Sequence, residues 1–116
     1  MHNFRQLQIW KEGMETTKQV YLLLEKFPSS EKFGLISQIS RCAVSVPSNI
    51  AEGSSRSSNK EFAHFLSIAL GSLFELETQL LLAIELGIID RDEMGLIIES
   101  VIQLQKKISA FKKTLK

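Results

Sequence analysis

Apolar residues recur at alternating steps of three and four along four stretches of the chain, a spacing that lines one face of an α-helix. The first stretch, about residues 7–26, repeats Leu7, Trp10, Met14, Thr17, Tyr21 and Leu24. The second, about 31–52, repeats Leu35 or Ile36, Ile39, Ala43, Val46 and Ile50. The third, about 59–86, repeats Phe62, Leu66, Ala69, Leu73, Leu76, Leu80 and Ala83. The fourth, about 91–114, repeats Met94, Ile97, Val101, Leu104, Ile108, Phe111 and Leu115.

Polar residues and glycines at the ends of these stretches predict where each helix begins and ends. Three pairs have the spacing of a capping box: Asn3 with Gln6, Ser58 with Glu61, and Asp90 with Glu93. Ser29 or Ser30 is expected to cap the second helix. Gly53 and Gly87 are placed as C-terminal glycines of the second and third helices.

Pro47 lies inside the second predicted helix. A proline there removes one backbone hydrogen bond and crowds the carbonyl of Ala43. The sequence predicts a kink at this point, or a helix restart with Pro47 in its first turn.

The connections between the four helices are short, so neighbouring helices are expected to run antiparallel. The predicted architecture is a single all-α domain over residues 1–116, an up-down-up-down four-helix bundle. The first and third helices are more apolar than one core requires. Their apolar residues outside the stripes are Ile9, Val20, Leu22, Leu23, Phe65, Ile68, Leu70, Phe74, Leu81 and Leu82. The excess favours self-association through exposed apolar faces; the alternative is a large core with some exposed leucine.

The composition is ordinary for a soluble globular protein, with 44% apolar residues, 23% charged residues and a net charge of +1. The single cysteine, Cys42, is expected to be a small core residue. The first residues lack the basic-then-apolar order of a signal peptide, and the apolar stretch at residues 80–89 is too short to span a bilayer. We expect a cytoplasmic protein without a membrane partner.

No convergent set of catalytic or ligand-binding residues is apparent. Neither His2 nor His64 has a second metal ligand four residues away. Residues 53–55 lack the spacing and the lysine of a phosphate-binding loop. Cys42 has no nearby histidine in the sequence, and its apolar neighbours are expected to raise its pKa. The sequence therefore predicts no enzyme, cofactor, metal site or small-molecule substrate.

Two polar stripes accompany the apolar ones. The second helix carries Gln38, Arg41, Ser45, Ser48 and Glu52, with Asn49 adjoining, and the third carries Ser67, Gly71, Glu75 and Thr78. Counting outward from the connection brings Arg41 level with the Gly71–Glu75 region, which suggests a buried Arg41–Glu75 ion pair that fixes the register. The alternative is that both stripes are solvated faces.

The C-terminal segment is rich in lysine and contains no acid from residue 105 onward. Its basic residues are Lys106, Lys107, Lys112, Lys113 and Lys116. Such a cluster can attract nucleic-acid phosphates, and it also complements the dipole at a helix C-terminus. No aromatic residues alternate with these lysines in the sequence to support base stacking.

Several motifs resemble those of a known family. The central run, residues 37–53, reads SQISRCAVSVPSNIAEG. A second block contains Lys60-Glu61-Phe62, Phe65-Leu66, Ile68-Ala69, Gly71-Ser72 and residues 75–80, and the chain opens with Phe4, Leu7 and Trp10 before a Phe27-Pro28 turn. Together they closely resemble the four-helix-bundle proteins encoded within intervening sequences of bacterial large-subunit ribosomal RNA genes. The chain differs at Ser40, where the family often has a second arginine beside Arg41.

The resemblance implies a homopentameric ring without enzymatic activity. It implies a structural or interface role for the motif residues Arg41, Ser45, Pro47, Ser48, Asn49, Glu52 and Gly53, and Glu75 is placed with them. A related family member, the basic accessory variability protein of diversity-generating retroelements, binds nucleic acid and a reverse transcriptase. By similarity we expect a homopentamer that binds structured RNA or DNA through its lysines. The alternative is a protein-interaction scaffold or accessory subunit with little nucleic-acid affinity of its own.

Overall fold

The computed structural model describes residues 2–115, which form four long helices and one short helix. The elements are η1 (Phe4–Gln6), α1 (Gln8–Leu24), η2 (Ser29–Glu31), α2 (Leu35–Ser54), α3 (Asn59–Glu85), α4 (Arg91–Met94) and α5 (Ile97–Lys113). No strand occurs within residues 2–115. The prediction of an all-α protein is confirmed.

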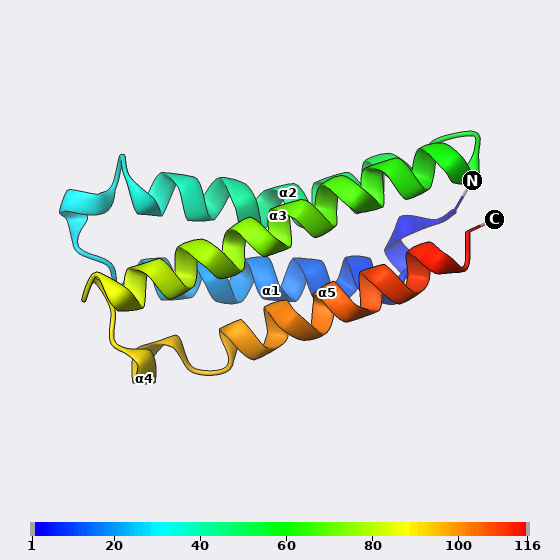
Figure 1. Cartoon of the computed structure of the whole chain (residues 1–116). Helices are drawn as coiled ribbons and strands as arrows, with labels where there is room; N and C mark the ends of the chain where they lie inside the picture. Colours follow the sequence, from blue (N-terminus) through cyan, green and yellow to red (C-terminus); the bar gives the residue numbers. More distant parts are fainter. Residues whose placement is uncertain (1, 116) are drawn as a thin grey trace.

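The four long helices lie side by side in an elongated body of 44 × 23 × 19 Å, and the chain reverses direction between successive long helices (Figure 1). Helix α1 packs against α2 and α5, and α3 packs against the same two helices. Both termini and the α2–α3 connection lie at one end of the body, whereas the α1–α2 connection and α4 lie at the other (Figure 1). We call residues 2–16, 45–72 and 105–115 the terminal half, and residues 17–44 and 73–104 the far half.

One predicted helix start is wrong, and the fourth predicted helix, which begins at Arg91 as expected, is broken. Ser29 and Ser30 lie in the short 3-10 turn η2 and do not cap α2, which begins at Leu35 after Gly34. The carboxylate of Glu31 accepts a hydrogen bond from the Leu35 backbone N–H at 3.3 Å instead. Near the fourth helix, Gly95 has a φ of +60°, a conformation that ends α4 after one turn and delays α5 until Ile97.

Of the other predicted helix ends, some are confirmed and some are not. Asn3 accepts a hydrogen bond from the Arg5 backbone N–H and so caps η1, not α1. The side chain of Asp90 makes no capping hydrogen bond. Ser58 does cap α3, because its hydroxyl accepts from the Glu61 N–H at 3.1 Å. Gly87, with a φ of +71°, ends α3 in the predicted Schellman motif, in which the Ile88 N–H donates to the Ala83 carbonyl at 2.9 Å.

The apolar stripes of α2, α3 and α5 form the core. Each stripe contributes fully buried side chains: Ile39, Val46, Ile50, Phe62, Leu66, Leu73, Leu76, Leu80, Val101, Leu104 and Ile108. Helix α3 is also long and apolar enough to cross a bilayer by length and composition alone, with a mean hydropathy of 1.4 over its best window. Its apolar stripe packs inside the bundle.

Helix α1 buries a face rotated from the predicted one, although Leu24 of the predicted stripe is buried and Leu7 and Trp10 pack against the core. Met14 and Tyr21, expected in the core, are 48% and 49% exposed. The buried residues of α1 include Ile9, Gly13, Thr16, Val20 and Leu23. These positions also alternate by four and three, and the small residues Gly13 and Thr16 let a neighbouring helix come close. Helix α1 therefore has two apolar stripes, and packing against small residues decided between them.

Pro47 lies inside α2 without a helix restart, because α2 runs unbroken from Leu35 to Ser54. Proline has no N–H, so the Ala43 carbonyl four residues earlier lacks its helical partner. The hydroxyl of Thr17 on α1 lies 2.9 Å from that carbonyl and 2.8 Å from the carbonyl of Gly13. A Cβ on Gly13 would meet the Pro47 ring at 3.6 Å. Helix α1 thus supplies the hydrogen bond that Pro47 removes from α2, and Gly13 packs beside the proline ring at an ordinary contact distance.

Gly53 was expected to end α2 with a positive φ, and this expectation is wrong. Gly53 lies within the helix, where it is buried against α3. A Cβ at this position would lie 2.7 Å from the Phe65 Cβ and 2.8 Å from the Phe62 Cδ1. The glycine is needed because the two helices approach closely here, and a side chain would collide with a nearly immobile atom of α3.

Gly53→Ala is expected to destabilise the protein by about 1–3 kcal/mol, because the new methyl overpacks the α2–α3 contact. Gly71→Ala is the matched control: it also adds a methyl inside a long helix, but nothing lies within 4 Å of its Cβ position. That control is expected to stabilise the protein by about 0.5–1 kcal/mol. Urea unfolding followed by circular dichroism measures both. Equal effects of the two substitutions would contradict the close-approach explanation.

Thr17→Val is expected to destabilise the protein by about 1–3 kcal/mol, since it leaves the Ala43 carbonyl without a partner while nearly keeping the side-chain shape. Pro47→Ala restores a helical N–H for the same carbonyl. In that background, Thr17→Val is expected to cost much less. The free energies of unfolding of the four proteins form a double-mutant cycle, and a coupling energy near zero would show that the Thr17 hydroxyl does not serve the proline.

Candidate nucleic-acid interface

Charge is unevenly distributed along the bundle. The terminal half contains eight lysines and arginines and only four glutamates: Arg5, Lys11, Arg56, Lys60, Lys106, Lys107, Lys112 and Lys113, against Glu12, Glu15, Glu52 and Glu61. In the far half the ratio is inverted, with five basic residues against nine acidic ones. Within residues 2–115 the two halves carry equal and opposite excesses of charge, which the net charge of +1 for the whole chain does not reveal.

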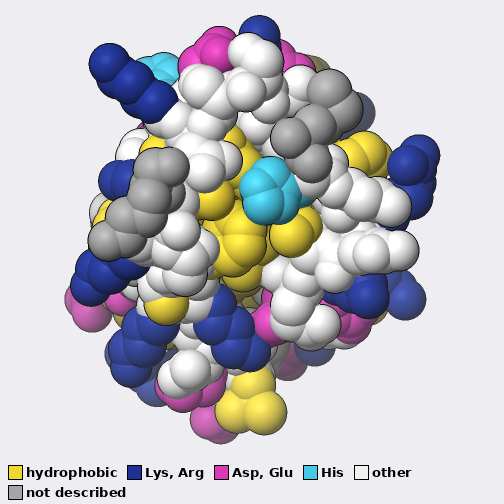
Figure 2. Space-filling model, turned by 90° about the vertical axis from the view of Figure 1, so that its right-hand side faces the viewer, with side chains coloured by type: hydrophobic (Ala, Val, Ile, Leu, Met, Phe, Trp, Pro, Cys, Tyr) yellow, Lys and Arg dark blue, Asp and Glu magenta, His cyan; other side chains and the backbone are white. Residues whose placement is uncertain are grey.

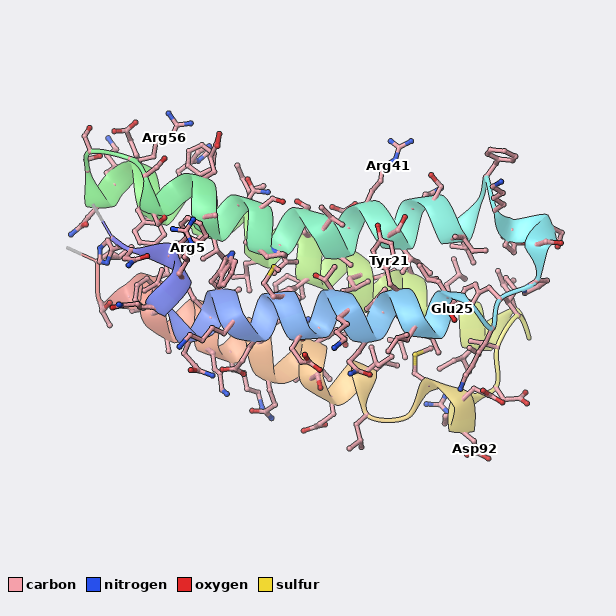
Figure 3. The ribbon with its side chains drawn as sticks, turned by 180° about the vertical axis from the view of Figure 1, so that it is seen from behind. Arg5, Tyr21, Glu25, Arg41, Arg56 and Asp92 are labelled. Atoms are coloured by element: carbon pink, nitrogen blue, oxygen red, sulfur yellow. The ribbon has the colours of Figure 1, made fainter. Side chains whose placement is uncertain are left out.

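The figures show this polarity directly. Lysine and arginine side chains surround the end that carries both termini, around a hydrophobic centre in which a histidine lies (Figure 2). From behind, Arg5 and Arg56 lie near the same end of the bundle, and Glu25 and Asp92 lie near the opposite one (Figure 3). An approaching polyanion would meet a favourable potential at the terminal end and an unfavourable one at the far end.

Aromatic side chains organise the terminal end. The His2 ring packs against Phe62 and Phe111, with centroids 5.0 and 6.1 Å away. The His2 backbone N–H donates to the Ser54 carbonyl at 3.0 Å, which attaches the N-terminal segment to the end of α2. The Arg56 guanidinium lies over the Phe65 ring at 4.7 Å and forms an ion pair with Glu52. The basic end therefore contains packed aromatic rings beside its cationic side chains.

The five C-terminal lysines do not form one patch. Lys106 and Lys113 lie on the side of α5 that faces α3, where they line the same groove. Lys107 lies beside α1 and forms an ion pair with Glu12 at 2.7 Å. Lys112 is half-buried, and Lys116 lies outside the described residues. The structure thus brings Lys106 and Lys113 together and separates Lys107 from them.

The groove that these two lysines share runs between α3 and α5. Its lining residues are Leu70, Phe74, Gln105, Lys106, Ser109, Ala110 and Lys113, none of which is acidic. The Phe74 side chain is 53% exposed. Aromatic residues do not alternate with the lysines in the sequence, because the ring and the lysines come from different helices. One sequence signal was available: Phe74 is an aromatic residue outside the core stripe of its helix.

The motif residues of α2 divide into two groups. Pro47 and Gly53 are buried, the hydroxyl of Ser45 lies 2.8 Å from that of Ser72 on α3, and the Asn49 amide donates to the Ser45 carbonyl at 2.8 Å. The second group is exposed on the bundle surface and consists of Arg41, Ser48 and Glu52; Glu75 on α3 is exposed as well. The first group thus supports the fold, and the second is accessible for contacts outside the chain.

The expected Arg41–Glu75 pair does not form among the described residues. Arg41 is exposed and points away from the bundle (Figure 3). The next residue, Cys42, faces α3 instead, and Glu75 is close enough to influence its thiol. Counting residues along α2 and α3 placed this part of α2 at about the correct level beside Glu75. Cys42 and not Arg41 faces α3, because one position along a helix rotates the side chain by about 100°.

Cys42 lies half-buried at the edge of the α2–α3 contact. Burial raises the pKa of its thiol, the negative charge of Glu75 acts in the same direction, and a hydrogen bond with Gln79 partly opposes them. The predicted direction of the pKa shift is confirmed. Such a thiol carries little thiolate at neutral pH and is a poor nucleophile.

The histidines also have packing partners. His2 stacks on the aromatic cluster described above, and the His64 ring lies 5.8 Å from that of Phe65. Within residues 2–115, no group of three or more His, Cys, Asp or Glu side chains is arranged to hold a metal ion.

Comparisons with known proteins agree with this architecture. The chain is similar to a crystal structure, at 1.70 Å resolution, of a protein of unknown function from the S23 ribosomal protein family of Bacteroides thetaiotaomicron VPI-5482, with a TM-score of 0.83 and 25% sequence identity over 90% of this chain and 98% of that one. No curated protein sequence matches the chain. The model of the 23S rRNA-intervening sequence protein family matches residues 5–110. This match extends over nearly all of the four helices, and the chain therefore belongs to the 23S rRNA-intervening sequence protein family.

Proposed function

We propose that this protein is a non-enzymatic, homo-oligomeric helical bundle of the cytoplasm that binds structured nucleic acid, RNA or DNA, through its terminal half. The observation that carries the proposal is the segregation of charge, with eight basic residues against four acidic ones in that half. Lysine and arginine side chains there contact phosphates and release counterions, a mode of binding that needs no catalytic group and little sequence specificity. The family's description makes ribosomal RNA the first ligand to test.

Self-association would amplify this charge, and we propose a homopentameric ring. Exposed apolar side chains support association: Met14 and Tyr21 on α1 and Val44 on α2 lie on neighbouring helices and are each more than 40% exposed. Apolar side chains grouped in this way are typical of interfaces between subunits. In a ring whose bundles share one direction, the basic halves of all copies lie on the same face, and their potentials add.

A second function, a protein-interaction scaffold or an accessory subunit similar to that of a reverse transcriptase, is favoured by a different observation. Three large apolar side chains protrude from the connections of the far half: Phe33 is 90% exposed, Leu96 79% and Leu86 62%. A protein partner that covers them would bind at the end opposite to the basic one. Its affinity would then depend on these residues and only weakly on salt.

Replacing Lys106, Lys107, Lys112 and Lys113 by Gln is expected to weaken binding to a structured RNA and to reduce the slope of log K against log salt by roughly 0.9 for each phosphate that the variant no longer neutralises. Fluorescence-anisotropy titrations at several salt concentrations measure the slope. The matched control replaces four basic residues of the far half, Lys18, Lys26, Lys32 and Arg91, by Gln, and is expected to leave the slope unchanged. Failure of the unmodified protein to bind RNA or DNA even at low salt would contradict the proposed function and leave the scaffold.

Glu substitutions at Met14 and Tyr21 are expected to reduce the mass of the assembly, because they place charges on the apolar face proposed for self-association. Sedimentation velocity is expected to give five times the 13.1 kDa mass of one chain for the unmodified protein. Lys18→Glu is the control, since it adds the same side chain at another exposed position of α1. A 13.1 kDa unmodified protein would contradict the ring.

A further inference from the structure

The geometry points to the groove between α3 and α5 as the seat of an unpaired nucleobase, with the base on the Phe74 ring and the adjoining phosphates on Lys106 and Lys113. This inference rests on the proposed function and specifies where a single-stranded part of the nucleic acid binds.

Phe74 is available for stacking because the core does not use it. Its neighbour Leu73 and the next stripe residue Leu76 are fully buried, whereas the Phe74 side chain is about half exposed. Leu70 and Ala110 continue the apolar lining beside it. Every base has a flat π-face, so an exposed ring above an apolar floor accepts bases of any sequence.

The charged residues that line the groove favour an anionic ligand. Lys106 and Lys113 are seven residues apart on α5, or two helical turns and about 10 Å, and no lining residue is acidic. The nearest carboxylate of α3 that faces α5, Glu77, already accepts a hydrogen bond from the Gln105 amide at 2.7 Å. The lysine ammonium groups therefore remain available to phosphates.

The arrangement also gives the strand a direction. Gln105 contacts the Leu73 carbonyl, Lys106 lines the same groove as Phe74, and Lys113 lies two turns farther along α5 toward the terminal end. On its other side, Phe74 borders a shallow surface with Glu75, which repels phosphates. A strand seated on Phe74 would run past Lys106 and Lys113 to the basic end of the bundle.

A duplex cannot use this site in the same way, because its bases already stack on one another. Unpaired loops and bulges of a structured RNA expose their base faces and are the usual targets of aromatic side chains. The basic end would bind the phosphates of the structured part, and the groove would bind an unpaired segment next to it.

The test measures fluorescence anisotropy with a labelled oligothymidylate and with a hairpin duplex. Phe74→Ala is expected to weaken single-strand binding roughly tenfold, which lies within the range for loss of one stacked base, and to leave both the duplex affinity and the salt slope unchanged. Phe74→Trp keeps a ring and is expected to retain single-strand binding. Lys106→Gln with Lys113→Gln is expected to reduce the single-strand salt slope by about 1.4.

Leu82→Ala is the matched control, because Leu82 is an exposed apolar residue of α3 that does not line the groove. Circular dichroism and sedimentation of each variant verify the fold and the assembly. If Phe74→Ala binds the single strand as well as the unmodified protein does, the inference is overturned while the proposed function stands. If the unmodified protein binds neither probe, both are overturned. A change in assembly mass caused by Phe74→Ala would assign the groove to a second copy of the chain and also overturn the inference.

Discussion

The Ala43 carbonyl has no helical partner because Pro47 lacks an N–H, and the rest of the packing depends on how α1 replaces that partner. Thr17 supplies the hydroxyl, and Gly13 lies beside the proline ring at an ordinary contact distance. This contact forms with one particular face of α1 turned toward α2. That rotation buries Ile9 and Val20, and it leaves Met14 and Tyr21 on the surface. The face of α1 that packs on α2 also decides which apolar side chains of α1 remain for a partner.

The opposite side of α2 is constrained equally strongly. Gly53 allows the helix to come within contact distance of Phe62 and Phe65, and the Ser45–Ser72 contact satisfies the small polar groups between the helices. Small residues therefore lie at both contacts of α2, the one with α1 and the one with α3. The motif around Pro47 is thus explained mainly by packing, although its exposed members Arg41, Ser48 and Glu52 are not.

The sequence predicted what depends on periodicity within one helix. The stripes of α2, α3 and α5, the cap at Ser58 and the Schellman motif at Gly87 could all be predicted because each involves residues within a few positions of one another. The face of α1 could not, since two stripes of similar length compete and the outcome depends on the neighbouring helix. Gly53 and the Arg41–Glu75 hypothesis were misinterpreted for the same reason: both concern the distance and rotation between two helices. The break at Gly95 was missed because the apolar stripe of the fourth helix continues through it.

The candidate interface shows the same limitation at a larger scale. Lys106 and Phe74 are 32 residues apart in the chain, and only the register of α3 against α5 makes them neighbours. The basic half of the bundle likewise combines segments from the beginning, middle and end of the sequence, so that neither the net charge nor any local run reveals it.

Charge that is separated along the long axis of a bundle has a specific consequence for assembly. Copies that associate side by side around a common axis cover parts of their circumference but leave their ends accessible. Charges on the circumference are then partly buried or neutralised between copies, whereas charges at the ends remain exposed and add on each face.

Because the desolvation of charged groups is costly, an apolar strip along the side and a basic cluster toward the end is the distribution that permits self-association and polyanion binding at the same time. Met14 and Tyr21 lie in such a strip, and the basic cluster lies toward the end that carries Arg5 and Arg56. The two proposed properties therefore occupy different surfaces of the same bundle, and one does not exclude the other.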